Sequence, residues 1–514
     1  MKNILLIGVG PHARRNHLPA LLDARRDGLV STVVGVDLLE AEAVVEGHRA
    51  TGPVGEVVMH YVESFSATED TLPGEVRALL DRVVREHSVD AVLVATEPSF
   101  HVVYSKWALG AGLSVLLDKP LSVHADSSTD PARAARIQTD FDDLARAYDA
   151  ARREDADVVV SVQCQRRYHP AFLVMRDLVA EVAAYTNCPV TSVQSFHSDG
   201  QWRLPDELLD IGYHSFDRGY GKAAHSGYHF FDIVPWLIEA GERPGKALDS
   251  VEVHVNSTRP VDLLAQLTHT DYDRLFPGFA EAVRYPEDEL RAAVAGFGEV
   301  DAFVSLAFKS TGRTVTLGSI NLVHNGFSQR GSFLPNSADL YKGNGRVRHE
   351  THIVEQGPFQ AIHFHSLQSL DDDHGGAGTR GGHDIGEKGH VSLHVFRNDA
   401  FNPGWRRYEG LDRDAVERAA GGHGEPSQSA SRRRAVHEFL EFLNGKRDRA
   451  SMASELPTHR RSSALMAGTY LSAARQWAGR PGVVAVDFRR SPREPGEPHG
   501  GLGPVPGEGG VRRP

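Results

Sequence analysis

The N-terminus of this 514-residue chain carries a short apolar run that leads directly into a glycine-rich turn. Residues Ile4–Ile7 contain no polar side chain, as in a buried strand. The turn reads Gly8-x-Gly10-x-x-Ala13, and helical periodicity follows it, apart from a break at Pro19. A strand, a turn of small residues and a helix in this order predict the first unit of a dinucleotide-binding fold.

A second predicted strand, Thr32–Asp37, ends in an acidic residue. In a dinucleotide-binding fold, small residues in the first turn let the backbone approach the pyrophosphate, which lies at the helix N-terminus. Asp37 can accept hydrogen bonds from the adenosine ribose hydroxyls, and its charge would repel a 2′-phosphate. The sequence therefore favours NAD over NADP. A tight turn followed by a solvated Asp is the alternative, and it fits this strand–turn–helix context less well.

Strands and helices continue to alternate further along the chain. Asp90–Thr96 reads as a buried strand, and the helical segment after it ends at Gly112. Leu113–Leu117 is a further strand, which runs directly into Asp118. Alternation of this kind is typical of a parallel sheet with helical crossovers. We therefore expect residues 1–157 to form an α/β domain of the Rossmann type.

The pattern changes from residue 158 onward, where strands outnumber helices. Ala302–Phe308 and Thr314–Leu322 read as the two strands of a hairpin, and Pro286–Gly296 reads as a helical insertion. We expect residues 158–488 to form an α+β domain with a large, mainly antiparallel sheet that binds substrate and mediates oligomerisation. Residues 489–514 are rich in Pro, Gly and charge, which predicts a disordered tail.

Composition excludes several classes of partner. Apolar residues make up 40% and charged residues 24%, as in an ordinary globular protein. The net charge of −12 argues against nucleic acid or an anionic membrane as the main partner. The chain has only two cysteines, which fits a reducing cytosol, and no apolar run reaches transmembrane length. We expect a cytoplasmic protein that acts on a small molecule.

The segment GYGKAAHSGYHFFD places His225, His229 and Asp232 at positions i, i+4 and i+7. In a helix these three side chains share one face. Two imidazoles and a carboxylate on one face can hold a metal ion or move a proton during catalysis. They can also form a polar helix face without any chemistry. The residues alone leave these three interpretations open.

Two other segments carry similar residue types. Asp210–Asp217 (DIGYHSFD) has nearly the same spacing, but the glycine-rich residues after it break a helix. We therefore expect Asp210 and His214 to lie in a loop near the pocket, where they could supply a carboxylate. Residues 371–389 combine many glycines with His and Asp in no defined metal-ligand spacing. A mobile, solvated loop is the expectation there.

Four stretches together resemble the glucose–fructose oxidoreductase/inositol dehydrogenase/MocA (Gfo/Idh/MocA) family. They are GVGPHARRNHLPAL, ATEPSFHVVYSKWALGAGLSVLLDKPLS, VQCQRRYHPAF and GYGKAAHSGYHFFDIVPWL, and they span residues 1 to about 240 in the order of the family. In the second stretch, Asp118 replaces the Glu of the family's EKP segment. In the fourth, Gly219 and Gly221 align with the leading glycines. The C-terminal half matches only loosely, as a sheet followed by helices.

The resemblance implies a site around the carbon that exchanges hydride with the nicotinamide. Its catalytic residues would be Lys119, His229 and His225, the last standing where the family usually has Asp. A carboxylate there would orient the catalytic His and raise its basicity, which an imidazole cannot do. The implied cofactor-binding residues are Gly8, Gly10, Pro11, His12, Ala13, Asp37, Thr96, Glu97, Pro98, His101, Asp118 and Lys119. The expected substrate-binding residues are Arg166, Arg167, Tyr168, Lys222 and Asp232.

The leading hypothesis is an NAD-dependent oxidoreductase that transfers hydride between the nicotinamide and a secondary alcohol or ketone of a sugar, cyclitol or related polyol. Mutual repulsion among Lys119, His225 and His229 would lower the imidazole pKa values and leave a neutral base. Two alternatives stay open: a redox-neutral enzyme that keeps NAD bound (a hydrolase, lyase or epimerase), and a non-catalytic dinucleotide-binding protein. We expect no catalytic metal, and a homodimer or homotetramer.

Overall fold

The computed structural model describes residues 1–49, 52–66, 71–212, 214–334, 345–369, 389–421 and 424–488. The tail 489–514, predicted to be disordered, lies outside the described residues, as does the predicted loop 371–389 except for Gly389. Among the described helices, none combines the length and apolar character needed to span a bilayer.

The N-terminal domain is built on a six-stranded sheet in which every neighbouring pair is parallel, with the order β3-β2-β1-β4-β5-β6. The strands are β1 Lys2–Ile7, β2 Val30–Leu38, β3 Val58–Val62, β4 Ala91–Val94, β5 Ser114–Leu117 and β6 Val160–Val162. This order is that of a Rossmann fold, in which the direction of winding reverses between β1 and β4. The predicted fold of this domain is confirmed. Strand β6 lies beyond residue 157, so the sheet continues past the boundary that the sequence suggested.

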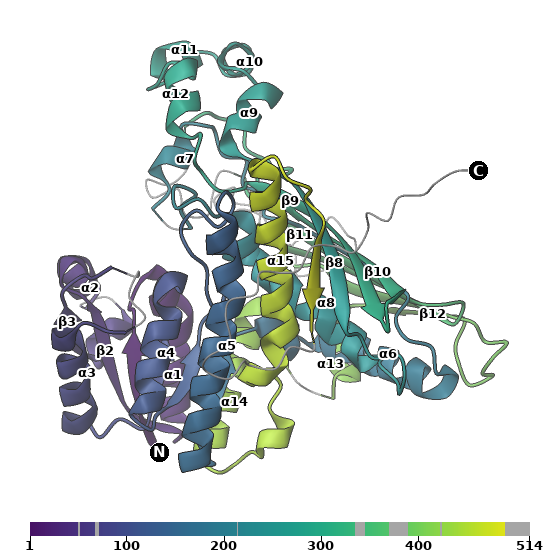
Figure 1. Cartoon of the computed structure of the whole chain (residues 1–514), viewed down its shortest axis with the longest axis horizontal. Coiled ribbons are helices and arrows are strands. Elements are labelled where there is room, and N and C mark those ends of the chain that lie inside the picture. The colour runs from purple at the N-terminus through teal and green to yellow at the C-terminus, as the bar shows by residue number, and fades with distance from the viewer. Residues whose placement is uncertain are drawn as a thin grey trace, which may run out of the picture.

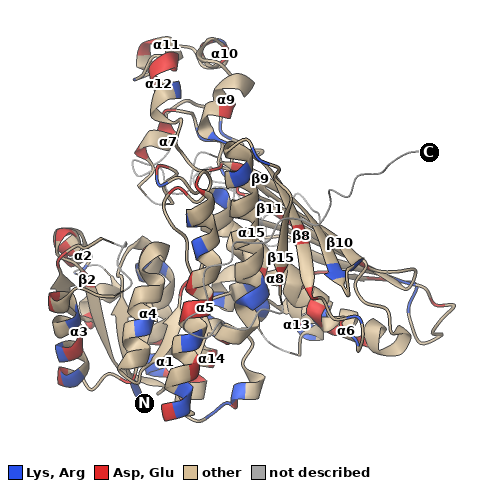
Figure 2. Ribbon diagram, viewed as in Figure 1, with Lys and Arg blue, Asp and Glu red and all other residues tan. Residues whose placement is uncertain are grey.

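Five helices accompany this sheet: α1 Leu18–Arg26, α2 Glu42–Gly47, α3 Gly74–Glu86, α4 His101–Gly110 and α5 Pro131–Glu154. The helical path before α1 begins at Pro11 and contains a π-helical turn, Ala13–His17. Pro19 does not break this path, because it follows directly on the π-helical turn, where the regular hydrogen-bond pattern of an α-helix is already interrupted. Figure 2 shows acidic and basic residues mixed on α3, as i,i+4 pairs such as Arg77–Asp81 require.

The second domain is built on a nine-stranded sheet with the order β14-β13-β12-β11-β7-β10-β9-β8-β15. Only the pair β7–β10 is parallel, and the remaining described pairs are antiparallel, as expected for this domain. The predicted hairpin is confirmed as β9 and β10. The strands are β7 Ser192–Ser198, β8 Ser250–Thr258, β9 Asp301–Ser310, β10 Arg313–Val323, β11 Arg348–Gln356, β12 Gln360–Ser369, β13 Val391–Arg397, β14 Tyr408–Leu411 and β15 Val484–Asp487.

Helices α6 (Pro170–Thr186), α8 (Tyr228–Ala240) and α15 (Arg460–Trp477) pack on one face of this sheet. Along β9, buried residues alternate with exposed ones such as Phe303, so the opposite face is left uncovered. A small helical lobe projects away from the sheet (Figure 1). It consists of α7 Glu207–Asp210, α9 Pro260–Gln266, α10 His269–Leu275, α11 Phe279–Ala282 and α12 Glu287–Ala293.

The two domains share their cores. Helices α5 and α15 run side by side through the middle of the molecule (Figure 1). Helix α14 (Gln428–Leu443) returns to the N-terminal domain, where Val436, Phe439 and Leu440 join the apolar cluster of β1, β2 and α1. Helix α13 (Arg413–Ala419) packs against α6. Residues from the far C-terminal part of the chain therefore help to enclose the nucleotide domain.

Candidate active site

A cavity lies between the carboxyl edge of the parallel sheet and the second domain. The nucleotide domain contributes His12, Asn16, Asp118 and Lys119 to its wall. The second domain contributes Gln163, Gln165, Arg166, His197, Asp199, Gln201, Arg203, Ile211, His214, Phe216, His225, Ser226, His229, His324, Arg346 and Arg348, and α14 adds Gln428 and Arg432. Ligands of open α/β sheets bind at this edge, where the strand order reverses.

The glycine-rich turn has the shape that a pyrophosphate needs. Gly8 has φ +90°, and a Cβ there would lie 2.6 Å from the carbonyl oxygen of Ala95, so only glycine fits. A Cβ on Gly10 would meet nothing within 4 Å, which leaves the approach to the helix N-terminus open. The Asp37 carboxylate is held beside this turn, because the backbone N–H groups of Val9 and Leu38 each donate to it at 2.8 Å.

The end of β4 forms the neighbouring part of the same edge. Thr96, Glu97 and Pro98 follow the strand directly, as the sequence suggested. His101 is buried, and its Nδ1 and Nε2 lie 2.8 Å and 3.0 Å from the carbonyl oxygens of Pro120 and Thr96. Both ring nitrogens thus face backbone groups. In this arrangement His101 ties two strand ends together and has no nitrogen left for a cofactor.

Two histidine side chains face the carboxylate of Asp118. The Nε2 atoms of His12 and His17 each lie 3.7 Å from Asp118 Oδ2, and the two rings meet edge to face at 5.1 Å. Burial lowers the pKa of His12 to about 3, while the two histidines hold the pKa of Asp118 well below its ordinary value. The sequence did not single out His17. Its position beside Asp118 follows from the π-helical turn, which local periodicity does not reveal.

Lys119 reaches across the cavity from the nucleotide domain to the second domain. Its Nζ donates a hydrogen bond of 2.6 Å to the backbone carbonyl of His225. The pKa of Lys119 is lowered, chiefly by burial and further by Arg432 and Arg166, while Asp118 raises it. The predicted catalytic lysine is therefore brought to the segment that carries the predicted catalytic histidines.

Both histidines of the motif line the cavity. They lie on one continuous helical path, the π-helical turn Ala223–Gly227 followed by α8. His229 Nδ1 is buried and has no hydrogen-bond partner among the described residues. Burial, more than neighbouring charge, holds the pKa values of His225 and His229 well below the ordinary value of 6.5. The expected direction of the shift is found, but desolvation contributes more than repulsion.

Three residues expected to bind substrate lie elsewhere. Asp232 is fully buried. Its carboxylate accepts hydrogen bonds from Arg167, from Nε to Oδ2 at 3.0 Å and from Nη2 to Oδ1 at 2.6 Å. The hydroxyl of Tyr168 donates to Glu438 on α14 at 2.5 Å. Asp232, Arg167 and Tyr168 do not line the cavity. Their assignment to substrate was wrong, because each is already used by an ion pair or hydrogen bond that joins elements of the core.

Arg166, by contrast, lies on the cavity wall. Its Nε and Nη2 each donate to one oxygen of Glu350 at 2.7 Å, and its guanidinium lies 4.3 Å from the ring centre of Phe230. The remaining nitrogen, Nη1, is buried without a hydrogen-bond partner among the described residues. Adjacent arginines of the same short 3₁₀ turn, Arg166 and Arg167, thus serve different purposes.

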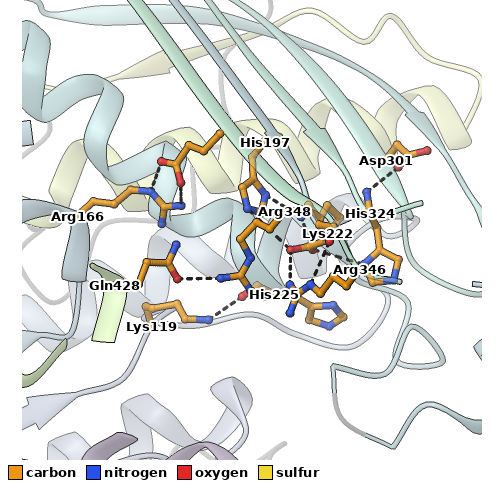
Figure 3. A network of polar contacts seen from close by, with 12 residues as sticks. Lys119, Arg166, His197, Lys222, His225, Asp301, His324, Arg346, Arg348 and Gln428 are labelled. Atoms are coloured by element: carbon orange, nitrogen blue, oxygen red, sulfur yellow. Dashed lines mark hydrogen bonds and ion pairs between the residues drawn. The ribbon is translucent and has the colours of Figure 1, made fainter. Parts of the chain in front are cut away.

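Asp199, which directly follows β7, is a residue of the site that the sequence analysis missed. Lys222, Arg346 and His324 surround its carboxylate, with Arg346 Nη2 at 3.1 Å and His324 Nδ1 at 3.5 Å (Figure 3). Lys222 was expected to bind substrate, but like Arg167, Tyr168 and Asp232 it does not line the cavity, because its ammonium is used by the ion pair with Asp199. Burial lowers its pKa to about 8. A carboxylate that follows a strand and precedes a glycine was the available signal, but it is too common to be decisive.

The upstream repeat of the motif is divided between two environments. His214 lines the cavity, and its ring lies over that of His225 with centroids 4.7 Å apart. Asp210 forms an ion pair with Arg284 on the lobe and does not line the cavity. The carboxylate absent from position 225 is therefore not supplied by Asp210. Asp199 is an acid whose charge does act on His225, and it opposes the lowering of the pKa of that ring.

Comparison with known proteins agrees with this geometry. Residues 2–159 match the model of the Gfo/Idh/MocA oxidoreductase family, described as having an NAD-binding Rossmann fold. The N-terminal domain is thus similar to the NAD-binding domain of this family. The assignment of Gly8, Gly10 and Asp37 to the cofactor stays a prediction.

One curated relative, the inositol 2-dehydrogenase of Corynebacterium glutamicum, is 25% identical over 193 residues, which are 38% of this chain and 46% of that protein. The match thus spans less than half of the length of the relative. Two solved structures share the fold of 95% of this chain. An oxidoreductase domain protein from Kribbella flavida is covered in full, with TM-score 0.56 and 17% identity. The WlbA dehydrogenase from Bordetella pertussis, in complex with NADH and UDP-GlcNAcA, is covered to 97%, with TM-score 0.52 and 15% identity.

Proposed function

We propose that the chain is an NAD-dependent oxidoreductase that acts on a secondary alcohol, or the matching ketone, of a sugar, cyclitol or related polyol. The observation that carries the proposal is that Lys119 and His229 line the same cavity, together with His12 and Asn16 from the helical path that follows the glycine-rich turn. A relative named inositol 2-dehydrogenase supports a polyol as the substrate class.

Gly8, Gly10 and Asp37 would hold the cofactor, which when bound supplies the hydride acceptor. His229 is the base in this proposal. Because its pKa lies well below 6.5, the ring is neutral near pH 7 and can accept the proton of the substrate hydroxyl. The Lys119 ammonium donates to the hydroxyl oxygen and stabilises the negative charge that develops there as the proton leaves.

His225 acts in this proposal as a positioning residue. Its backbone carbonyl anchors Lys119 Nζ, while its ring is held between His214 and Phe216, with ring centres at 4.7 Å and 5.2 Å. Its side chain supplies no negative charge, so the neutral form of His229 is maintained down to a lower pH than a carboxylate neighbour would allow.

Steady-state kinetics tests the proposal directly. The purified chain is incubated with NAD and a panel of sugars, cyclitols and sugar acids, and NADH is followed at 340 nm while products are separated by chromatography. Accumulation of NADH in proportion to a ketone product is the expected result. Product without net NADH would instead support the redox-neutral alternative, and tight NAD binding without any product would support the non-catalytic one.

We also propose that the chain forms a homodimer or homotetramer through the uncovered face of the second sheet. Phe303, Leu317, Phe396 and Tyr408 are all at least 42% exposed. The first three lie on β9, β10 and β13, where residues of the opposite face are buried, and Tyr408 lies on the neighbouring edge strand β14. Apolar surface of this kind is typical of subunit interfaces. Light scattering should give a multiple of 56.2 kDa, and Leu317→Asp should reduce it to one chain. A wild-type mass of one chain would contradict the proposal.

A further inference from the structure

The wall of the cavity is cationic, although the chain as a whole carries a net charge of −12. Six Lys and Arg side chains line the cavity against two carboxylates, those of Asp118 and Asp199, among the described residues. The six are Lys119, Arg166, Arg203, Arg346, Arg348 and Arg432. A positive cavity in a negative protein concentrates anions at that one place.

The two carboxylates of the wall are already engaged by cations and histidines. Asp199 lies between Lys222 and Arg346, and His12 and His17 face Asp118. Asp199 carries one negative charge and contacts two cations, Lys222 and Arg346, so the three side chains together retain a positive charge. Lys222 is buried behind the cavity wall. The site therefore does not neutralise its own cations with the acids of its wall.

Arg166 offers the most specific feature. Glu350 takes two of its three guanidinium nitrogens and leaves Nη1, a buried donor on the wall, without a partner. A buried donor of this kind loses its hydrogen bond to water and gains nothing in return unless a ligand supplies an acceptor. His229 Nδ1 and His324 Nε2 are likewise buried without partners among the described residues. The residues of the cavity wall therefore have several polar atoms that could form hydrogen bonds with a polar ligand.

Arg348 lies close enough to Arg346 and Arg166 for their charges to act on it. Burial, together with the charges of Arg346 and Arg166, lowers its pKa to about 10, although Asp199 and Glu350 act in the opposite direction. Like charges held together in a poorly solvated site repel one another, and an anion bound among them relieves the repulsion. Gln428, which accepts a hydrogen bond from Arg348 Nη1 at 3.0 Å, brings no charge to offset them (Figure 3).

The cofactor is the other anion of the site and has to be accounted for separately. Its pyrophosphate is expected at the Gly8–Gly10 turn, on the nucleotide domain. Arg432 donates to Asn16 of that domain at 3.4 Å, and we assign it to the cofactor side. Arg166 and Arg348 come instead from the second domain, from the 3₁₀ turn Gln165–Tyr168 and from β11.

We propose that the substrate carries an oxyanion, a carboxylate or a phosphate, that Arg166 Nη1 binds with the support of Arg348 and Arg346. The substrate class is thus an acidic sugar, cyclitol or polyol. This inference rests on the proposed oxidoreductase function of the same cavity. A guanidinium is suited to the role, because its planar fork matches both oxyanions and its charge is permanent.

Binding is measured first, without turnover, by calorimetry on the full chain saturated with NADH. The probes are glucose, glucuronate and glucose 6-phosphate, together with myo-inositol and an inositol monophosphate. We expect at least one acidic probe to bind 10-fold or more tightly than its neutral partner, with an affinity that falls as salt is added. The carboxylate and phosphate members of the set then distinguish the two oxyanions. Binding of all acids no tighter than that of the neutral partners would overturn the inference.

The variant Arg166→Lys tests the named residue. A lysine can keep the ion pair with buried Glu350, so the fold is preserved, but it loses the second arm of the fork that faces the cavity. We expect the preference for the acid over its neutral partner to fall at least 10-fold while the affinity for the neutral probe is unchanged. The control is Arg176→Gln, which removes an exposed arginine outside the cavity. An unchanged preference in Arg166→Lys, with the thermal midpoint of the wild type, would contradict the assignment.

A second variant, Arg348→Gln, keeps the test independent of the Glu350 pair and should weaken acid binding in the same direction. The inference and the proposed function fail in different ways. Equal oxidation of acidic and neutral probes would leave the oxidoreductase in place and remove the anion site. Tight, Arg166-dependent binding of acids without NADH formation would leave the anion site in place and remove the oxidoreductase.

Discussion

The ammonium of Lys119 is hydrogen-bonded to the backbone carbonyl of His225 at 2.6 Å, across 106 residues of sequence. The lysine is thereby positioned by the main chain of residue 225, independently of the side chain there. This explains how an imidazole can stand where the family usually has a carboxylate, since the lysine keeps its anchor with either side chain. The carboxylate would affect the charge of His229 but is not needed to place Lys119.

Replacing Lys119 by Met should reduce turnover by about 10²–10⁴, because the donor that stabilises the developing charge on the substrate oxygen is removed. The affinity for NADH should change little, since the cofactor is held mainly by the glycine-rich turn and Asp37. The check is kcat on the true substrate together with an NADH titration by fluorescence. Lys446→Met, at an exposed position, is the matched control and should behave like the wild type.

His229→Gln should lose activity by a similar factor, about 10²–10⁴, because no neutral base remains beside the substrate hydroxyl. His214, from the upstream segment Asp210–Asp217, also lines the cavity. The variant His214→Gln therefore tests which of the two similar segments supplies the base. Near-full activity of His229→Gln combined with an inactive His214→Gln would show that the upstream segment supplies the base.

His225→Asp should keep substantial activity and move the acid limb of the pH–rate profile to higher pH. A carboxylate near His229 favours the protonated ring, which raises its pKa from the low value of the wild type. The base is then protonated at a higher pH, and activity is lost earlier on acidification. The profile of kcat/KM between pH 5 and 9 measures this. An acid limb shifted to lower pH would contradict the proposed effect of the side chain at position 225 on the pKa of His229.

Asp37→Ala should narrow the preference for NAD over NADP by weakening NAD binding. Calorimetric titration of both cofactors is the measurement. Tighter binding of NADP than of NAD by the wild type would overturn the assignment of Asp37. Asp27→Ala, at an exposed position after α1, gives the matched control.

The protein should lose stability as the pH falls below about 6.5, the ordinary pKa of histidine. Many buried histidines have a lowered folded-state pKa, among them His12, His101, His169, His225 and His229. Below pH 6.5 the unfolded chain therefore binds more protons than the folded chain does. Each such group contributes up to about 1.4 kcal/mol per pH unit below 6.5. Calorimetric scans from pH 8 to 5 should show Tm constant above 7 and falling below 6.5. A flat Tm would contradict the burial of these rings.

No tightly held metal should be found, although two groups of donors among the described residues lie close enough to hold one: His12, His17 and Asp118, and Cys164, Asp232 and His459. In the second group, Arg167 already occupies the carboxylate. Elemental analysis of the purified protein, with activity measured before and after EDTA, checks this. About one transition metal per chain, with activity lost on chelation, would show that the prediction is wrong.

Local sequence patterns were sufficient for the nucleotide domain. The strand, small-residue turn and terminal acid of Ile4–Asp37 each act within a few residues, and the antiparallel hairpin of β9 and β10 is likewise local. The helical spacing of the motif predicted that His225 and His229 face the same cavity. These features depend on neighbours in sequence, which is why they could be predicted.

The rest of the site depends on contacts between distant segments. Arg166 and Arg167 are adjacent and chemically identical, and only the positions of Glu350 and Asp232 decide which one faces the cavity. Asp199, Arg346 and Arg348 lie at the ends of β7 and β11, strands whose pairing joins segments far apart in the chain. No local motif marks such residues, because strand pairing alone brings them together.

Because α14 completes the core of the nucleotide domain, the order in which the chain is synthesised affects when this domain can fold. The strands and helices of the nucleotide domain are made early, but α14 is made late. It carries Gln428 and Arg432 of the cavity wall and the apolar side chains that cover β1 and α1. Until then the nascent domain exposes the apolar surface that Val436, Phe439 and Leu440 later bury. The half of the molecule that is made first can therefore be completed only when nearly the whole chain has emerged, so a fragment that ends after β6 should aggregate where the full chain folds.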